Sequence, residues 1–474
     1  MSSTSCTRLV DHAPVSRFFT WRLVILPLCL LIFILASVDF INFDLLYNTF
    51  RYSYAIEDTS SKTLNATALP LVKAATTSPV LFKRRKEVLN VDCKRLFNND
   101  RKYAMQIARR RPRMRENVGL PMTCEAIKSR ILPPRNNNTG FPIAFARIVH
   151  KDYEFLEELL AANYAEENLY CFSIDSKASP AFHMSIRSLE SCFPNVVVPR
   201  REESTDGAGH NQNTAHVDCL RSLENQTWNY AILLQNHDII IKTHAEMTAI
   251  LRIYGGANDV EITPCSVDRC PPYLERNLGK LGLCSDKLTA EQKAICKRSN
   301  IKWAKGAMQV ILSREAVDFM LNDVDIQPLI NELNRMNFGV DEVLYESLQI
   351  TNEIHWPGGF VDKCRDNTQA EFISRFSDWS GNCPSGYNRH GICVFGVEDL
   401  PRLANHTRVM ANKMLPEFDY AAISCMNELL FNRTRGIVDS SLNLHHYENI
   451  NAVRLHRDRR QGKLNLTSFQ CSLL

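Results

Sequence analysis

Residues 142–150 read PIAFARIVH, and residues 169–175 read LYCFSID. Both are short and mostly apolar, as buried strands are, and the segment 153–165 between them gathers its apolar residues on one helical face. A strand, a helix and a second strand in this order are typical of a parallel α/β sheet. This stretch therefore predicts an α/β fold.

The same alternation continues toward the C-terminus. We expect further strands at 195–198, 230–238 and 306–314, and helices at 215–223, 244–254, after 314 and from Asp341 onward. Ligands of such sheets bind at the carboxyl ends of the strands. Asp175 and Asp238 are expected at two of these ends, where they either line a nucleotide site or cap the following helix.

An uncharged apolar run, residues 23–38, lies near the N-terminus. With the apolar residues on both sides it nears the ~20 residues that span a bilayer. Arginines precede it and aspartates follow it, so the N-terminus is expected in the cytosol. We expect a cytosolic tail (1–22), a signal-anchor transmembrane helix (23–43), a lumenal stem (44–92) and a lumenal catalytic domain (93–474). A cleaved signal peptide is the alternative, but Ala36-Ser37 is a poor cleavage site.

Cysteines and sequons both favour a lumenal body. Fourteen of the sixteen cysteines follow the anchor, as in proteins of oxidising compartments. Six N-x-[ST] sequons also follow it, at Asn65, Asn137, Asn225, Asn405, Asn432 and Asn465. The insertion 264–303 contains no CxxC pair and no paired histidines, which favours disulfides over zinc. The sequence leaves open the partners of Cys265, Cys270, Cys284, Cys296, Cys364 and Cys471.

Two basic runs, 83–86 and 109–111, lie at the start of the expected lumenal body. They are interpreted either as a solvated surface or, for the first, as a protease site that releases a soluble form. The formal net charge is +4, from 56 basic and 52 acidic residues, which is too mild to indicate nucleic-acid binding. Phosphate-loop, HExxH and GxSxG motifs do not occur in the sequence.

No DxD motif stands at a predicted strand end. Asp175 belongs to SIDSK and Asp238 to NHDI, whereas the one literal DxD, residues 323–325, follows the helix after 314. Acids are commonplace at helix ends, so this motif is interpreted as accidental. We therefore expect no metal cofactor.

Taken in order, several stretches resemble the core 2/I-branching β-1,6-N-acetylglucosaminyltransferases, whose relatives include peptide O-xylosyltransferases. They are PIAFARIVH, YCFSIDSKA, SCFPNV, DIIIKT, VDEVLYESL, CVFGVEDLP and ANK at 411–413. The resemblance covers about residues 93 to 430. It implies a GT-A type α/β domain, and the disulfides Cys93–Cys425, Cys124–Cys192, Cys171–Cys219 and Cys383–Cys393.

The resemblance also implies site residues. Glu342 of VDE matches the catalytic base, although acids at a helix start are also common. Arg389 and Lys413 match the cations that replace a metal at the diphosphate, with His390 as a competitor of Arg389 because the 383–393 loop is one residue longer than the family pattern. His150 and Asp175 match the uridine pocket, and Glu261 and Trp379 match acceptor-binding positions.

The expected function is an inverting, metal-independent Golgi glycosyltransferase. It would move GlcNAc, or glucose, from a UDP-sugar in β-1,6 linkage to core 1 O-glycans (Galβ1-3GalNAc on Ser/Thr). The segment 204–216 and the short stretch after Trp379 depart from the family pattern, which leaves donor and acceptor open. A protein O-xylosyltransferase-like enzyme and an inactive lectin-like Golgi protein are the alternatives. The expected partners are a UDP-sugar, O-glycosylated proteins and the Golgi membrane, with a homodimer also allowed.

Overall fold

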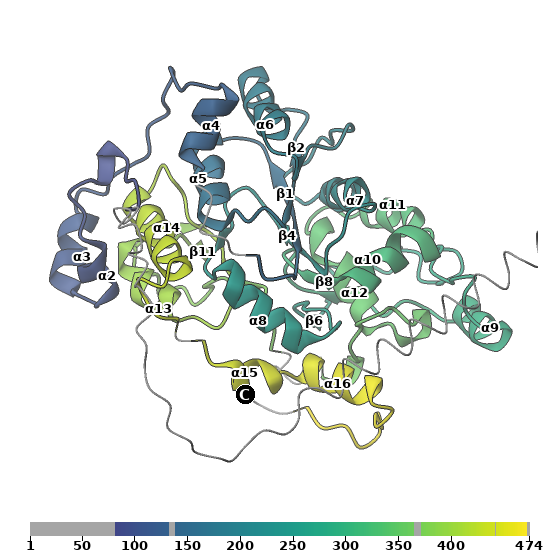
Figure 1. Ribbon diagram of the computed structural model, residues 1–474. Helices are drawn as coiled ribbons and strands as arrows, with labels where there is room; N and C mark the ends of the chain where they lie inside the picture. Colours follow the sequence, from purple (N-terminus) through teal and green to yellow (C-terminus); the bar gives the residue numbers. More distant parts are fainter. Residues whose placement is uncertain (1–80, 132–137, 365–370, 441, 472–474) are drawn as a thin grey trace, which may run out of the picture. The chain divides into compact units, whose positions relative to one another are not determined.

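The central sheet has the order β3–β2–β1–β4–β8 in the computed structural model (Figure 1). The strands β1, β2, β3 and β4 are parallel, and β8 pairs with β4 in the antiparallel sense. The structure describes residues 81–131, 138–364, 371–440 and 442–471. The mixed α/β fold with a parallel sheet is thus confirmed.

Burial on both faces explains why these strands contain almost no polar residues. All seven residues of β1 are buried, as is usual for parallel strands covered by helices on both sides. Phe145 packs into one apolar cluster with α5 and α14 residues, whereas Ala144 and Ala146 face a second cluster that includes α7 residues. In Figure 1, α5 and α7 accordingly lie on opposite sides of β1.

The strands of the central sheet are β1 (Ile143–Val149), β2 (Leu169–Ile174), β3 (Val196–Val197), β4 (Tyr230–Leu234) and β8 (Ile311–Ser313). Smaller sheets contain β5 (Ile239–Ile240), β12 (Met410–Ala411) and β9 (Arg375–Phe376); β10 (Asn388–Arg389) and β11 (Ile392–Cys393); and β6 (Thr263–Pro264) and β7 (Ala304–Lys305).

The α-helices are α2 (Cys93–Phe97), α3 (Arg101–Ala108), α4 (Cys124–Arg130), α5 (Tyr153–Asn163), α6 (Pro180–Cys192), α7 (Gln212–Ser222), α8 (His244–Tyr254), α9 (Ala290–Arg298), α10 (Arg314–Asp318), α11 (Gln327–Leu333), α12 (Leu344–Ile350), α13 (Leu400–Ala404), α14 (Tyr420–Thr434), α15 (Leu444–Glu448) and α16 (Asn451–Arg460). The tighter or wider single turns are η1 (Lys86–Val88), η2 (Phe319–Asp323), η3 (Val340–Glu342), η4 (Asn352–Ile354), η5 (Asp362–Cys364) and η6 (Val397–Asp399).

Three expected elements are shorter than the sequence pattern predicts. The strand expected over 230–238 ends at Leu234, because the Asp238 carboxylate accepts a hydrogen bond from the Gln235 amide (2.6 Å) and closes a turn. The strand expected over 306–314 keeps only β8, since the Gly306 amide donates to the Glu342 carbonyl instead of a strand (2.9 Å). The helix expected from Asp341 begins at Leu344, after the 3₁₀ turn η3.

All fourteen cysteines from Cys93 to Cys471 form disulfides, which rules out zinc at the cysteines of the 264–303 insertion. The four pairs implied by the resemblance are bonded as expected: Cys93–Cys425, Cys124–Cys192, Cys171–Cys219 and Cys383–Cys393. The pairs left open by the sequence are Cys265–Cys270, Cys284–Cys296 and Cys364–Cys471.

Three arginines of the basic runs form ion pairs with other parts of the fold, so the interpretation of these runs as a solvated surface does not hold for these three. Arg84 pairs with Glu428 (2.6 Å), and Arg85 pairs with Glu154. Arg111 pairs with Glu398 and Asp419, and only 12% of its side chain is exposed. A protease would reach the first run only after these ion pairs opened.

Described residues N-terminal to Cys93 also contribute to the fold. Val88 and Val91, in the expected stem, are buried in its core. The predicted tail, the anchor and the stem up to residue 80 lie outside the described residues. Within the described ranges, no helix has the length and apolarity that a membrane crossing requires. Asn225, Asn405 and Asn465 are exposed and Asn432 is half-buried, while Asn65 and Asn137 are outside the described residues.

Candidate active site

The order of the strands marks the carboxyl ends of β1 and β4 as the place where a ligand is expected, and we call this edge of the sheet the crevice. β2 and β3 lie on one side of β1, and β4 and β8 lie on the other, so β1 and β4 flank the point where ligands of open α/β sheets bind. His150 follows β1 and is exposed there, and its amide donates to the Asn236 side chain after β4 (2.8 Å). Arg147 holds the same turn through the carbonyls of Gln235 and Asp238. Burial lowers the pKa of Arg147 to about 10.

Asp238 is a structural residue of this crevice. It is fully buried, and its carboxylate accepts hydrogen bonds from the Gln235 amide (2.6 Å), from Gln309 (3.0 Å) and from Asn412 (2.7 Å). These protein donors occupy the lone pairs that a metal would need. Asp238 does not cap the following helix, since Thr243 caps α8, and its role at a nucleotide stays a prediction.

Asp175 has a similar internal role at the end of β2. Its carboxylate accepts from the Thr205 hydroxyl (2.5 Å) and from the Lys177 amide (2.8 Å), and the side chain is buried. These bonds fix the turn between β2 and α6, where uridine is expected by resemblance. A nucleotide contact through the Asp175 side chain stays a prediction.

Glu342 lies on η3, the turn that replaces the expected helix start. Its side chain is 31% exposed and forms an ion pair with Arg269, which lies in the short loop closed by Cys265–Cys270. The Arg269 guanidinium crosses Gly339, where a Cβ atom would lie 1.6 Å from its Nη2 atom, and it stacks on Phe338 (4.9 Å). Gly339 also has a positive φ of 67°, so glycine is required here for two independent reasons.

Three further carboxyl groups surround Glu342. Burial, then the charge of Glu342, raises the pKa of Asp341 to about 7. Glu346 is fully buried, and burial together with the charges of Glu342, Glu261 and Asp341 raises its pKa well above the ordinary range. Among the described residues its carboxyl oxygens have no hydrogen-bond partner. Burial thus favours the neutral form of Glu346 by raising its pKa, whereas the Glu342 side chain is partly exposed and paired with Arg269.

The two cations expected at the diphosphate lie close together. Lys413 follows β12 and is half-buried; burial lowers its pKa, and the neighbouring charges of Arg389 and Arg375 lower it further. Arg389 comes from the β10–β11 hairpin, which is closed by Cys383–Cys393. The Lys413 carbonyl accepts from the Phe395 amide (3.0 Å) just beyond this hairpin. His390, the competitor of Arg389, is exposed and does not contribute to the Lys413 shift.

Arg375 interacts both with the cations and with the cluster of acidic residues around Glu342. Its charge lowers the pKa of Asp341 as well as that of Lys413, and its guanidinium donates to Gln309 (3.0 Å). Gln235, at the end of β4, donates to Asp341 (3.4 Å). Arg375 and Gln235 thus link Asp341, the chain neighbour of Glu342, with Lys413 and the carboxyl end of β4.

The two residues expected to hold the acceptor lie in different settings. Glu261 is half-buried beside the cluster of acidic residues around Glu342. Its backbone carbonyl packs on Gly306, where a Cβ atom would lie only 2.1 Å away. Trp379 lies between β9 and β10, is 57% exposed, and rests its ring against Gly391. An exposed indole beside a crevice is suited to stack on a sugar. Their roles in acceptor binding stay predictions.

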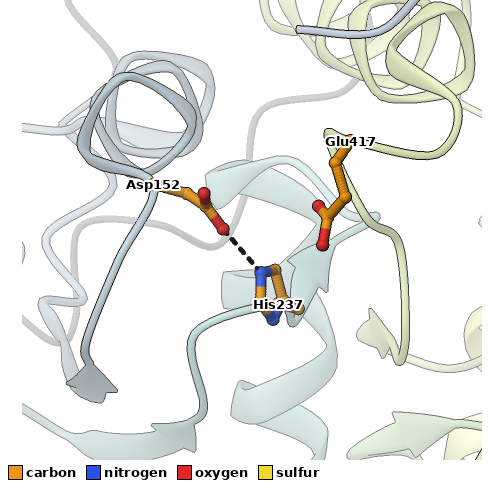
Figure 2. A group of neighbouring side chains, drawn as sticks. All are labelled: Asp152, His237 and Glu417. Carbon is orange, nitrogen blue, oxygen red and sulfur yellow. Dashed lines mark hydrogen bonds and ion pairs between the residues drawn. The ribbon is translucent and has the colours of Figure 1, made fainter. Parts of the chain in front are cut away.

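A further acid–histidine cluster borders His150. Figure 2 shows Asp152, at the start of α5, pointing toward His237, with Glu417 on the other side of the imidazole. The ligand atoms of the three residues lie within 4.8 Å of one another. The Lys151 ammonium is 3.4 Å from Asp152 and 3.3 Å from Glu417. It already supplies the positive charge that a metal would bring, so the cluster is assigned no metal.

The two acids of the literal DxD motif contact residues of the 264–303 insertion and none of the candidate site residues described above. Asp323 ends η2 and pairs with Lys287 (2.7 Å). The Asp325 carbonyl packs against Gly282, where a Cβ atom would lie 2.3 Å away. Both acids therefore belong to the surface of the insertion side.

Comparison with known proteins decides the family. Residues 143–404 match the model of the Core-2/I-Branching enzyme family, from β1 through α13. The chain belongs to the core-2/I-branching enzyme family. It is a glycosyltransferase of that family, and the match spans Glu342 and Arg389.

Individual members of the core-2/I-branching family are similar along most of the chain. The rat β-1,3-galactosyl-O-glycosyl-glycoprotein β-1,6-N-acetylglucosaminyltransferase 3 is 28% identical over 83% of this chain and 90% of its own length. The human β-1,3-galactosyl-O-glycosyl-glycoprotein β-1,6-N-acetylglucosaminyltransferase is 27% identical over 72% of this chain and 85% of its own length. The zebrafish enzyme 4 of the same name is 28% identical over 61% and 70%.

The sequence did not indicate three residues that surround the crevice in this family member. Arg269 lies in an irregular segment, Arg375 lies in the two-residue strand β9, which is too short for a periodic pattern, and Glu346 looked like an ordinary helix residue. Arg269 had one signal, since it is enclosed by the closely spaced pair Cys265 and Cys270. Arg375 and Glu346 gave none, because their environment comes from segments distant in the chain.

Proposed function

We propose that this chain transfers a sugar, GlcNAc in the first place, from a UDP-sugar in β-1,6 linkage to the core 1 disaccharide of O-glycans. The observation that carries the proposal is that the charge of Arg375 acts both on Asp341, the chain neighbour of Glu342, and on Lys413, which also senses the charge of Arg389. The names of the similar enzymes supply the donor and acceptor classes. The GT-A type of the domain belongs to the same proposal.

The chemistry assigns one task to each side of the crevice. The acceptor hydroxyl attacks C1 of the donor sugar, and the Glu342 carboxylate removes its proton. As the new C–O bond forms, the bond from C1 to the diphosphate breaks on the opposite face, so the anomeric centre inverts. UDP leaves with the bonding electrons, and Lys413 with Arg389 meets the charge that develops on the diphosphate. The Arg269 guanidinium holds Glu342 until an acceptor hydroxyl reaches it.

The metal-independent account predicts a specific pattern in a transfer assay with UDP-GlcNAc and core 1 disaccharide. Activity persists in excess EDTA, because side chains and not an ion stabilise the diphosphate. Lys413→Ala loses at least about tenfold in kcat/KM, since a charged hydrogen bond to phosphate contributes roughly 1.5–3 kcal/mol. Added Mn²⁺ does not restore it.

The matched control is Lys287→Ala, because Lys287 is 76% exposed and pairs with Asp323 outside the crevice. This variant should keep normal activity. Loss of turnover in EDTA with rescue by Mn²⁺ would refute the account of the leaving group. Parallel assays with UDP-glucose and UDP-xylose identify the donor. Absence of transfer from every UDP-sugar would contradict the proposed function itself.

We also propose that the enzyme is a single-pass type II protein of the Golgi membrane with its catalytic domain in the lumen. The apolar run at 23–38 and the exposed sequons at Asn225, Asn405 and Asn465 support this topology. Expression in a glycosylating cell should give a protein whose gel mobility rises after N-glycosidase treatment. Replacing the asparagines of the sequons by glutamine removes that shift. An unshifted wild-type protein would argue against a lumenal body.

A further inference from the structure

A cavity of about 640 Å³ is lined mainly by residues of 82–87, 115–120, α5 and α14, with Arg130 of α4 and His244 of α8 also at its wall. We call it the α5–α14 cavity; the two helices lie side by side in Figure 1. Its lining includes none of the residues placed in the candidate active site. Its volume is within the range of small-molecule sites, roughly 300–1,000 Å³.

Buried polar groups that face this cavity lack partners. Asn427, on α14, is 2% exposed, and within the described part of the chain neither its amide nitrogen nor its amide oxygen has a hydrogen-bond partner. The Asn163 side-chain oxygen on α5 also has no hydrogen-bond partner there, and the half-buried Glu87 carboxylate has none besides its ion pair with Arg85 (3.6 Å). Native proteins seldom leave such groups unpaired, and a primary amide needs a partner that both donates and accepts. A hydroxyl group does both.

The remaining walls favour a neutral ligand with apolar faces. Phe82 and Phe431 meet edge to face at 5.5 Å, and Tyr164 and Tyr420 also line the cavity. Charged neighbours are largely matched within the protein: Arg85 pairs with Glu154, and Arg130 pairs with Glu157. Paired charges leave little net attraction for an ion, whereas aromatic rings and amides together suit the C–H faces and hydroxyls of a sugar.

We propose that the α5–α14 cavity is a second carbohydrate site, which binds a mono- or disaccharide unit of a glycan apart from the transfer reaction. Sugar hydroxyls donate to the Asn163 and Asn427 oxygens and to Glu87, and one hydroxyl accepts from the Asn427 amide. The C–H face of the ring rests on the aromatic wall. Because the segment 82–87 forms one side, an occupied site also holds this segment against α14.

The test is equilibrium binding of free Galβ1-3GalNAc and free GlcNAc to the full chain in detergent, read by ligand-observed NMR. Asn427→Leu should weaken binding at the cavity at least ~10-fold, because it removes two hydrogen-bonding atoms. It should fold at least as stably as the wild type, since it also removes a buried unpaired amide. Ala161→Phe, which fills the cavity from α5, should abolish the same binding. The matched control is Asn331→Leu at an exposed position.

Two further measurements distinguish binding at the cavity from binding at the transfer site. The cavity signal should persist in Glu261→Ala and with saturating UDP, and Asn427→Leu should keep normal transfer to the free disaccharide. The proposal is overturned if neither sugar binds, so that the cavity holds only water, or if both cavity variants bind as the wild type does. It is equally overturned if the signal disappears in Glu261→Ala. These readouts do not require turnover, so a failure of the proposed function would leave them intact.

Discussion

Glu342→Gln is expected to lower kcat by roughly 10²–10⁴-fold, the contribution of a general base. The amide keeps the shape of the side chain and can still accept from Arg269, but it cannot take the proton of the acceptor hydroxyl. Binding of UDP should change little, because the diphosphate cations lie on the other side of the crevice. Steady-state kinetics together with a UDP titration measure both quantities.

The matched control for this variant is Glu346→Gln, one turn further along the chain. Glu346 is fully buried with a pKa raised well above the ordinary range, so burial favours its neutral form, which an amide resembles in shape. We expect kcat within about tenfold of the wild type, since no general base is lost. Near-normal turnover of Glu342→Gln would mean that Glu342 is only a turn residue, and Asp341 would become the candidate base.

The second large effect is expected on stability. Cys93–Cys425 joins residues 332 positions apart and ties α2 to α14. Closing so long a loop restrains the unfolded chain, and the other disulfides shorten its effective length, so removal by the Cys93→Ser and Cys425→Ser pair should cost about 4–5 kcal/mol of unfolding free energy. Denaturant unfolding under non-reducing conditions measures the loss.

The comparison is the Cys265→Ser and Cys270→Ser pair, whose disulfide spans only 5 positions. The same chain-entropy relation gives about 2 kcal/mol for so short a loop. Its removal should instead affect turnover, because the loop carries Arg269 to Glu342. Equal stability losses for the two pairs would contradict the chain-entropy account. Free thiols at Cys93 and Cys425 in a peptide map would refute the disulfide itself.

Regular elements with one strong pattern were predictable. The run of buried apolar residues in β1 and the helical face of α5 depend on neighbours a few positions apart, and both elements lie where the pattern indicates. The strand predicted over 306–314 and the helix predicted from Asp341 are both present but begin later than predicted. Their backbones bond to each other through Gly306 and Glu342, a contact across distant segments that no local pattern contains.

The sequence by itself determined the α/β class, the family and the residue types able to serve as base and leaving-group cations, because these follow from local periodicity and from motifs in a fixed order. Only the tertiary structure decided which of the acids is accessible and which have their pKa raised by burial. Asp341, Glu342 and Glu346 are near one another in the chain, yet burial raises the pKa of the first to about 7 and that of the last well above its ordinary range. Glu342 alone of the three is paired with an arginine among the described residues. Burial and pairing are set by Arg269, Arg375 and Gln235, which reach the crevice from segments far apart in sequence.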